Sequence, residues 1–108
     1  MGKQKLETID EFNEVLQREQ KFILVKHSLT CPISKAAFDE YEDFVSQNES
    51  IPTYYLYVQE ARPLSNFIAE TFSIRHESPQ ALLFEGGAVK WDASHRKITK
   101  ETLANASA

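Results

Sequence analysis

The sequence is poor in the residues that cross-link a chain or anchor it in a membrane. Its 108 residues include one cysteine, three glycines and four prolines. A single cysteine excludes a disulfide within the chain and a zinc site built from several cysteines. No apolar run approaches the roughly 20 residues that span a bilayer, and residues 1–5 lack the apolar stretch of a signal peptide. We therefore expect a cytoplasmic protein without a membrane span.

The charge and composition are those of an acidic globular protein. The formal net charge is −4, the pI is about 5.3, and 42% of the residues are hydrophobic. An acidic balance argues against binding to nucleic acid or to an anionic membrane through bulk charge. A chain of this length buries roughly two-thirds of its unfolded surface. No repeat or low-complexity linker divides it, so we expect one domain over residues 1–108.

Hydrophobic periodicity predicts that helices and strands alternate. Residues 8–20 have apolar positions at helical spacing, and Thr8 with Glu11 fits a capping box. Residues 21–27 contain a continuous apolar run, which is typical of a strand covered on both faces. Further helices are expected from Thr30 or Cys31 to 46, from Pro63 or Leu64 onward, and over 99–106. Further strands are expected over 53–58, 80–85 and 88–92. A glycine turn at 86–87 is expected to join the last two strands as a hairpin.

This element order predicts an α/β fold with helices on both faces of a central mixed sheet. The alternating first half implies right-handed crossovers and parallel strands, and the closing hairpin adds an antiparallel edge. The sheet has four strands, or five if residues 3–7 add a short one. This is the order of a thioredoxin-like domain.

Cys31 lies where such a fold often carries chemistry. The residue follows a buried strand and begins a helix, with Pro32 suited to the first turn. Free backbone N–H groups and the helix dipole at that point favour a thiolate, the nucleophile of disulfide exchange. Ser34 lies in the same turn and is expected to donate a hydrogen bond to the sulfur. The alternative is that Cys31 is a small buried apolar residue, which its position at a strand-to-helix junction disfavours.

The dipeptide Ser78-Pro79 precedes an expected strand, where proline is allowed at the first residue. A cis peptide bond there turns the backbone of Ser78 toward Cys31 and offers an N–H and a C=O to an extended substrate. The alternative is an ordinary trans proline that begins the strand.

Four basic residues lie near these two segments. Lys26 and His27 end the strand before Cys31, on opposite faces of it, while Arg75 and His76 precede the proline. They are candidates to attract an anionic ligand, although solvated loop charge explains Arg75 and His76 equally well. The three histidines are too scattered to predict a metal site.

Together these residues resemble the thioredoxin superfamily over almost the whole chain. Residues 22–25 resemble its central strand, and residues 72–75, 78–79 and 82–87 resemble its second half, while Ser34 replaces the usual second cysteine. The pentapeptide Thr30-Cys31-Pro32-Ile33-Ser34 is similar to that of the monothiol bacilliredoxins of low-GC Gram-positive bacteria (the YtxJ, or BrxC, group). Residues 27–29, 94–95 and 98–99 are similar to that group as well. Residues 76–77 depart from an ordinary thioredoxin, which suggests a different ligand near the proline.

The resemblance implies a thiol-disulfide oxidoreductase that removes bacillithiol from S-bacillithiolated proteins. Cys31 is its nucleophile, Thr30, Pro32, Ile33 and Ser34 complete its motif, and bacillithiol is a co-substrate rather than a bound cofactor. Because no second cysteine resolves the adduct, bacillithiol, another redoxin or a reductase must release it. Bacillithiol carries a malate, so Lys26, His27, Arg75 and His76, together with Ser78 and Pro79, are its expected contacts.

Two other functions remain open at this stage. Monothiol glutaredoxins with a Cys-x-x-Ser site can carry an iron–sulfur cluster between two subunits, because thiolates are the usual cluster ligands. Their motif typically contains glycine and phenylalanine, where this chain has Pro32 and Ile33. The other alternative is a non-catalytic binding module on the same scaffold, with an incidental Cys31.

Overall fold

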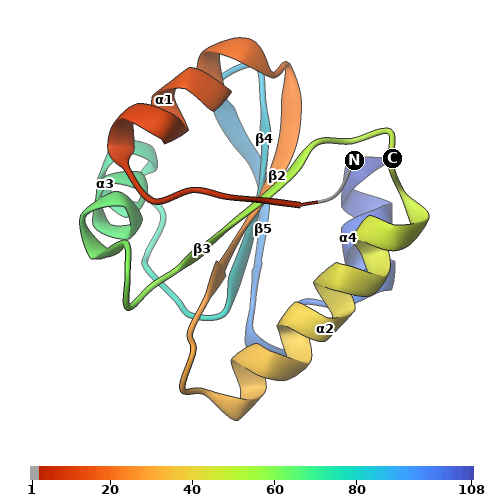
Figure 1. Cartoon of the computed structure of the whole chain (residues 1–108). Coiled ribbons are helices and arrows are strands. Elements are labelled where there is room, and N and C mark those ends of the chain that lie inside the picture. The colour runs from red at the N-terminus through yellow and green to blue at the C-terminus, as the bar shows by residue number, and fades with distance from the viewer. Residues whose placement is uncertain (1–2) are drawn as a thin grey trace.

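The computed structural model describes residues 3–108, which fold as a five-stranded sheet between two layers of helices. The strands are β1 (Gln4–Lys5), β2 (Lys21–His27), β3 (Thr53–Tyr57), β4 (Gln80–Glu85) and β5 (Ala88–Ser94). The helices are α1 (Ile9–Arg18), α2 (Pro32–Gln47), α3 (Arg62–Phe72), the short 3₁₀ helix η1 (His95–Lys97) and α4 (Lys100–Ser107). Figure 1 shows α1 and α3 on one side of the sheet and α2 and α4 on the other. Within residues 3–108, no helix has the length and apolarity to cross a membrane.

The strand order is β1-β3-β2-β4-β5. β1 and β3 run parallel to β2, whereas β4 is antiparallel to β2 and pairs with β5 as a hairpin. The predicted α/β class, the mixed sheet and the helices on both faces are therefore confirmed. The sheet has the fifth strand, although β1 contains only two residues.

The central strand β2 is buried on both faces, as its continuous apolar run predicted. Phe22 and Leu24 pack under α1 and α3, where Phe22 stacks on Phe84 with ring centroids 4.8 Å apart. Ile23 and Val25 pack on the opposite face, with the apolar side of α2. Two apolar layers therefore fix β2 and, with it, the point at which the chain leaves the sheet toward α2.

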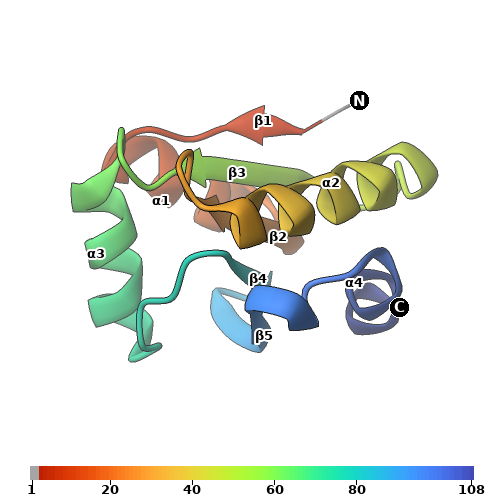
Figure 2. The ribbon, with the colours of Figure 1, turned by 90° about the horizontal axis from the view of Figure 1, so that it is seen from below.

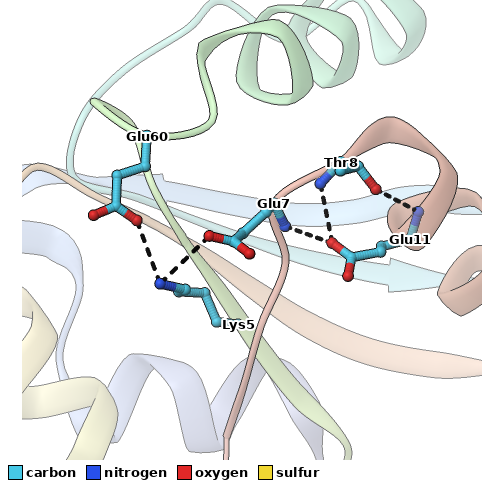
Figure 3. A network of polar contacts seen from close by, with 5 residues as sticks. All are labelled: Lys5, Glu7, Thr8, Glu11 and Glu60. Carbon is cyan, nitrogen blue, oxygen red and sulfur yellow. Dashed lines mark hydrogen bonds and ion pairs between the residues drawn. The ribbon is translucent and has the colours of Figure 1, made fainter.

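The start of α1 has the capping box that the sequence predicted. The Thr8 hydroxyl accepts a hydrogen bond from the Glu11 N–H at 3.1 Å, and the Glu11 carboxylate accepts from the N–H groups of Thr8 and Glu7 (Figure 3). These backbone donors lower the pKa of Glu11. Figure 3 also shows Lys5 between the carboxylates of Glu7 and Glu60, which ties the segment after β1 to the turn after β3. The helix ends at Arg18, two residues before the predicted end.

The end of the chain differs in detail from the prediction. Gly86 and Gly87 both have positive φ (62° and 79°), as a tight hairpin turn between β4 and β5 requires. β5 continues to Ser94, two residues past its predicted end, and contains a register shift opposite the Leu83–Phe84 step. The helix η1 was not predicted. It begins at His95, whose own φ is +57°, a conformation that a sequence pattern does not reveal for a non-glycine residue.

Candidate active site

Cys31 is the N-cap residue of α2, directly after the loop that leaves β2. Its backbone is extended (φ −107°, ψ 121°), Pro32 occupies the first helical turn, and the Cys31 carbonyl accepts the Lys35 N–H at 3.0 Å. The thiol is free and partly exposed, and it makes no capping hydrogen bond. The predicted junction of strand and helix is confirmed, and the partly exposed Cys31 lies beside the N–H groups that begin α2.

Pro79 lies at the same end of the sheet. The Ser78-Pro79 bond is cis, and Gln80, the next residue, pairs with Lys26 near the end of β2. Figures 1 and 2 show the loop from β2 to α2 and the segment that leads into β4 at this common end of the sheet. The Pro79 carbonyl accepts the His95 N–H at 3.0 Å, so it fixes the start of η1 as well. Of the two alternatives for this proline, the cis form is the one present.

Ser34 has a different role from the one expected. Its side chain is fully buried, and its Oγ accepts the Ser28 N–H at 2.8 Å and lies 2.9 Å from His27 Nδ1. Among residues 3–108, Ser28 and His27 are the hydrogen-bond partners of the Ser34 hydroxyl. The prediction of a hydrogen bond from Ser34 to the Cys31 sulfur is therefore wrong. Ser34 faces the end of β2, and it anchors the loop rather than the thiol.

His27 supports α2 through its ring. The imidazole stacks on Phe38 (centroids 4.4 Å apart) and lies tilted against the Tyr57 ring (centroids 5.6 Å apart). Burial lowers the pKa of His27, although the contact with Ser34 and the nearby carboxylates of α2 oppose this effect. The ring is therefore neutral at pH 7, and its Nδ1 is committed to Ser34. Whether His27 also touches a ligand stays a prediction.

Lys26 is enclosed by the protein, so the prediction that it contacts a ligand is wrong. The side chain is 0% exposed, and its Nζ donates to the Ser65 carbonyl at 3.1 Å and lies 3.3 Å from His76 Nδ1. Burial lowers the pKa of Lys26 to about 8. In this arrangement a ligand cannot reach the ammonium, because α3 and the segment before Pro79 cover it.

Arg75 and His76 are exposed and remain predicted ligand contacts. The Arg75 side chain is 91% exposed, and its Nε lies 3.6 Å from the Glu77 carboxylate. Desolvation and the neighbouring Lys26 ammonium lower the pKa of His76. The negative charge of Glu77 reduces the positive potential here.

Gln59 belongs to this site but was not found from the sequence. It follows β3, and its side-chain amide hydrogen-bonds the N–H of Leu29 and the hydroxyls of Ser28 and Thr30. These are the three residues that precede Cys31. The available signal was positional: Gln59 comes just after a strand parallel to β2, so both strand ends meet at one edge of the sheet.

A groove of about 460 Å³ runs beside the first two turns of α2. Pro32 and Ile33 of the motif line it together with residues of α2, η1 and the start of α4. The other lining residues are Ala36, Ala37, Glu40, His95, Arg96, Ile98 and Thr99. The lining combines apolar side chains with polar and charged ones, and it includes Pro32, the residue after Cys31. Sequence reasoning did not define this groove because η1 was not predicted.

Solved structures with the same architecture are thioredoxin-fold proteins. One of them, assigned as an oxidoreductase with a thioredoxin fold, is 39% identical with a TM-score of 0.92, covering 98% of this chain and 94% of that chain. Mitochondrial thioredoxin 3 from Saccharomyces cerevisiae is 14% identical with a TM-score of 0.77, covering 96% and 92% of the two chains. A thioredoxin from Malassezia sympodialis is 18% identical with a TM-score of 0.76, covering 95% and 85%. The last two matches show the fold alone.

Cys31 is partly exposed and caps the helix that follows the central strand, at the same end of the sheet as the cis-proline. This arrangement places the chain among the thioredoxin-fold thiol oxidoreductases. Residues 4–103 match the model of one family within that class. The chain belongs to the monothiol bacilliredoxin BrxC family.

Proposed function

We propose that this chain removes bacillithiol from S-bacillithiolated proteins, with Cys31 as the nucleophile. The Cys31 thiolate attacks the bacillithiol sulfur of the mixed disulfide. A new S–S bond forms between Cys31 and bacillithiol, the old S–S bond breaks, and its electron pair leaves with the sulfur of the substrate cysteine. The repaired protein departs as a thiolate, and Cys31 carries the bacillithiol.

The observation that carries this proposal is the contrast between positions 31 and 34. Cys31 is a free and partly exposed thiol, whereas Ser34 is a buried serine. A serine cannot attack the adduct, so a second bacillithiol, another redoxin or a reductase has to release it. Family membership supports the same one-cysteine chemistry.

Mass spectrometry after treatment with oxidised bacillithiol tests the proposal. We expect one bacillithiol on Cys31, its removal by added bacillithiol, and no adduct on the Cys31→Ser variant. A model protein that carries a bacillithiol mixed disulfide should lose it to the wild-type chain but not to that variant. If Cys31 gains no adduct under mild oxidation, the proposal is wrong.

A further inference from the structure

The side chain of Gln59 spans the three residues that lead to Cys31. Its Oε1 accepts the Leu29 N–H at 3.0 Å, and its Nε2 donates to Ser28 Oγ at 2.9 Å and to Thr30 Oγ1 at 3.4 Å. One amide therefore holds consecutive residues of the loop from outside the motif. On the other side of the loop, the Ser28 N–H is held by Ser34.

The chemistry of these groups fixes the direction of each hydrogen bond. A backbone N–H can only donate, so the oxygen of the Gln59 amide must face Leu29. The NH₂ group then faces the two hydroxyls, and both hydroxyls accept from it. A hydroxyl that accepts in this way keeps its own proton for another partner. Thr30 is exposed, so its proton is available to a group that approaches from solvent.

Thr30 is also the residue adjacent to Cys31. During disulfide exchange, negative charge moves from the Cys31 sulfur to the departing sulfur. A neutral donor held beside these sulfurs stabilises the charge in the transition state, provided that its orientation is set in advance. Gln59 sets that orientation, because its NH₂ group occupies an acceptor position of the Thr30 hydroxyl.

We propose that Gln59 is a positioning residue for the reaction of Cys31: through its hydrogen bond to Thr30, it orients the Thr30 hydroxyl as a donor to the reacting sulfurs. This inference rests on the proposed function only in that Cys31 attacks disulfides. Thr30 is the residue that acts on the sulfurs, and Gln59 acts through it. Neither role requires bacillithiol itself.

The experiment measures the second-order rate at which Cys31 attacks dipyridyl disulfide, across a pH series, for full-length variants. Gln59→Met keeps the length of the side chain without its polar atoms, and Thr30→Val keeps the shape without the hydroxyl. We expect each to lower the plateau rate about tenfold, the effect of losing one hydrogen bond to a charged group. Thr30→Ser keeps the hydroxyl and should keep the rate. Gln47→Met, at the far end of α2, is the matched control and should react like the wild type.

The double variant separates a positioning role from a structural one. If Gln59 acts through Thr30, the Gln59→Met/Thr30→Val protein is no slower than either single variant. A loss near the product of the two single effects, about a hundredfold, overturns the inference. It is overturned as well if Gln59→Met keeps the wild-type rate within about twofold. If the wild-type Cys31 itself fails to attack the reagent, the proposed function is what fails.

Discussion

The buried ammonium of Lys26 should make the stability of the protein depend on pH in a way that can be calculated. The side chain is fully buried at the end of β2, and its hydrogen-bond partners are a backbone carbonyl and a histidine nitrogen. Within residues 3–108, no carboxylate forms an ion pair with it. A buried charge without a counter-ion favours the neutral form of the group.

The magnitude follows from the shift in the pKa of Lys26. Burial lowers it from 10.5 to about 8, and each unit corresponds to about 1.4 kcal/mol. Between these two values the unfolded chain binds more protons than the folded one, so stability rises with pH over this interval. Below the folded-state pKa both states are protonated, and the folded state carries the full cost of about 3 kcal/mol. Above the unfolded-state pKa that cost is gone.

Replacement of Lys26 by methionine removes the titrating group and leaves a side chain of similar length. We expect the variant to be more stable than the wild type at neutral pH. Its advantage should shrink by about 2.5 kcal/mol between roughly pH 7 and pH 10, because the wild type loses its penalty over that range. Urea unfolding of both proteins at several pH values from 7 upward measures the difference, in which the titrating groups that do not contact Lys26 cancel.

Lys21→Met is the control for this experiment. Lys21 begins the same strand, and its partly buried ammonium donates to the Ser107 carbonyl. This substitution removes the same charge at the other end of β2. If the stability difference between Lys26→Met and the wild type does not change with pH, the ammonium is not buried as described and the reasoning is wrong.

Three further predictions concern the motif, a helix cap and the core. Ser34→Cys places a second thiol in the first turn of α2, three residues after Cys31. Once this side chain turns away from its contacts with Ser28 and His27, the variant should form an internal disulfide with Cys31 and release its adduct without added thiol; an adduct that persists in mass spectra would contradict this. Thr8→Ala removes half of the capping box and should lower the unfolding free energy by about 1 kcal/mol without changing the activity of the folded protein. A fall in activity under conditions in which the variant is still folded would refute this prediction. Phe12 is fully buried against four phenylalanine rings, so Phe12→Ala should cost about 3–5 kcal/mol in urea unfolding, and a cost below about 1 kcal/mol would contradict the packing.

The sequence predicted the elements whose signal is local. The apolar run of β2, the capping box at Thr8 and the paired glycines at 86–87 each specify a structure through residues that are neighbours in the chain. The position of Cys31 at the start of α2 follows from the same signals, because a buried strand ends just before it and Pro32 opens a helix. These features needed no knowledge of how distant segments meet.

The polar contacts of the site could not be predicted in this way. Lys26 is enclosed by Ser65 and His76, which lie 39 and 50 residues further along the chain. The sequence showed it only as a charge that bounds an apolar run, so an exposed ligand contact was the natural interpretation. Gln59 meets the Cys31 loop because β3 pairs with β2 in one particular register, and a register is not specified by either strand alone.

Position 34 shows why the one-cysteine chemistry is supported by the fold as well as by the motif. A backbone N–H that is shielded from water needs an acceptor, and Ser34 supplies one to the partly buried Ser28 while its oxygen also contacts His27. Sulfur is a weaker acceptor than a hydroxyl oxygen, so a cysteine at this position would exchange a good anchor of the loop for a second redox group. The serine thus holds the loop in place, and in the proposed reaction it leaves the adduct on Cys31 without an internal resolving thiol. Under this proposal, the lifetime of the adduct depends on whichever external thiol reaches the partly exposed Cys31.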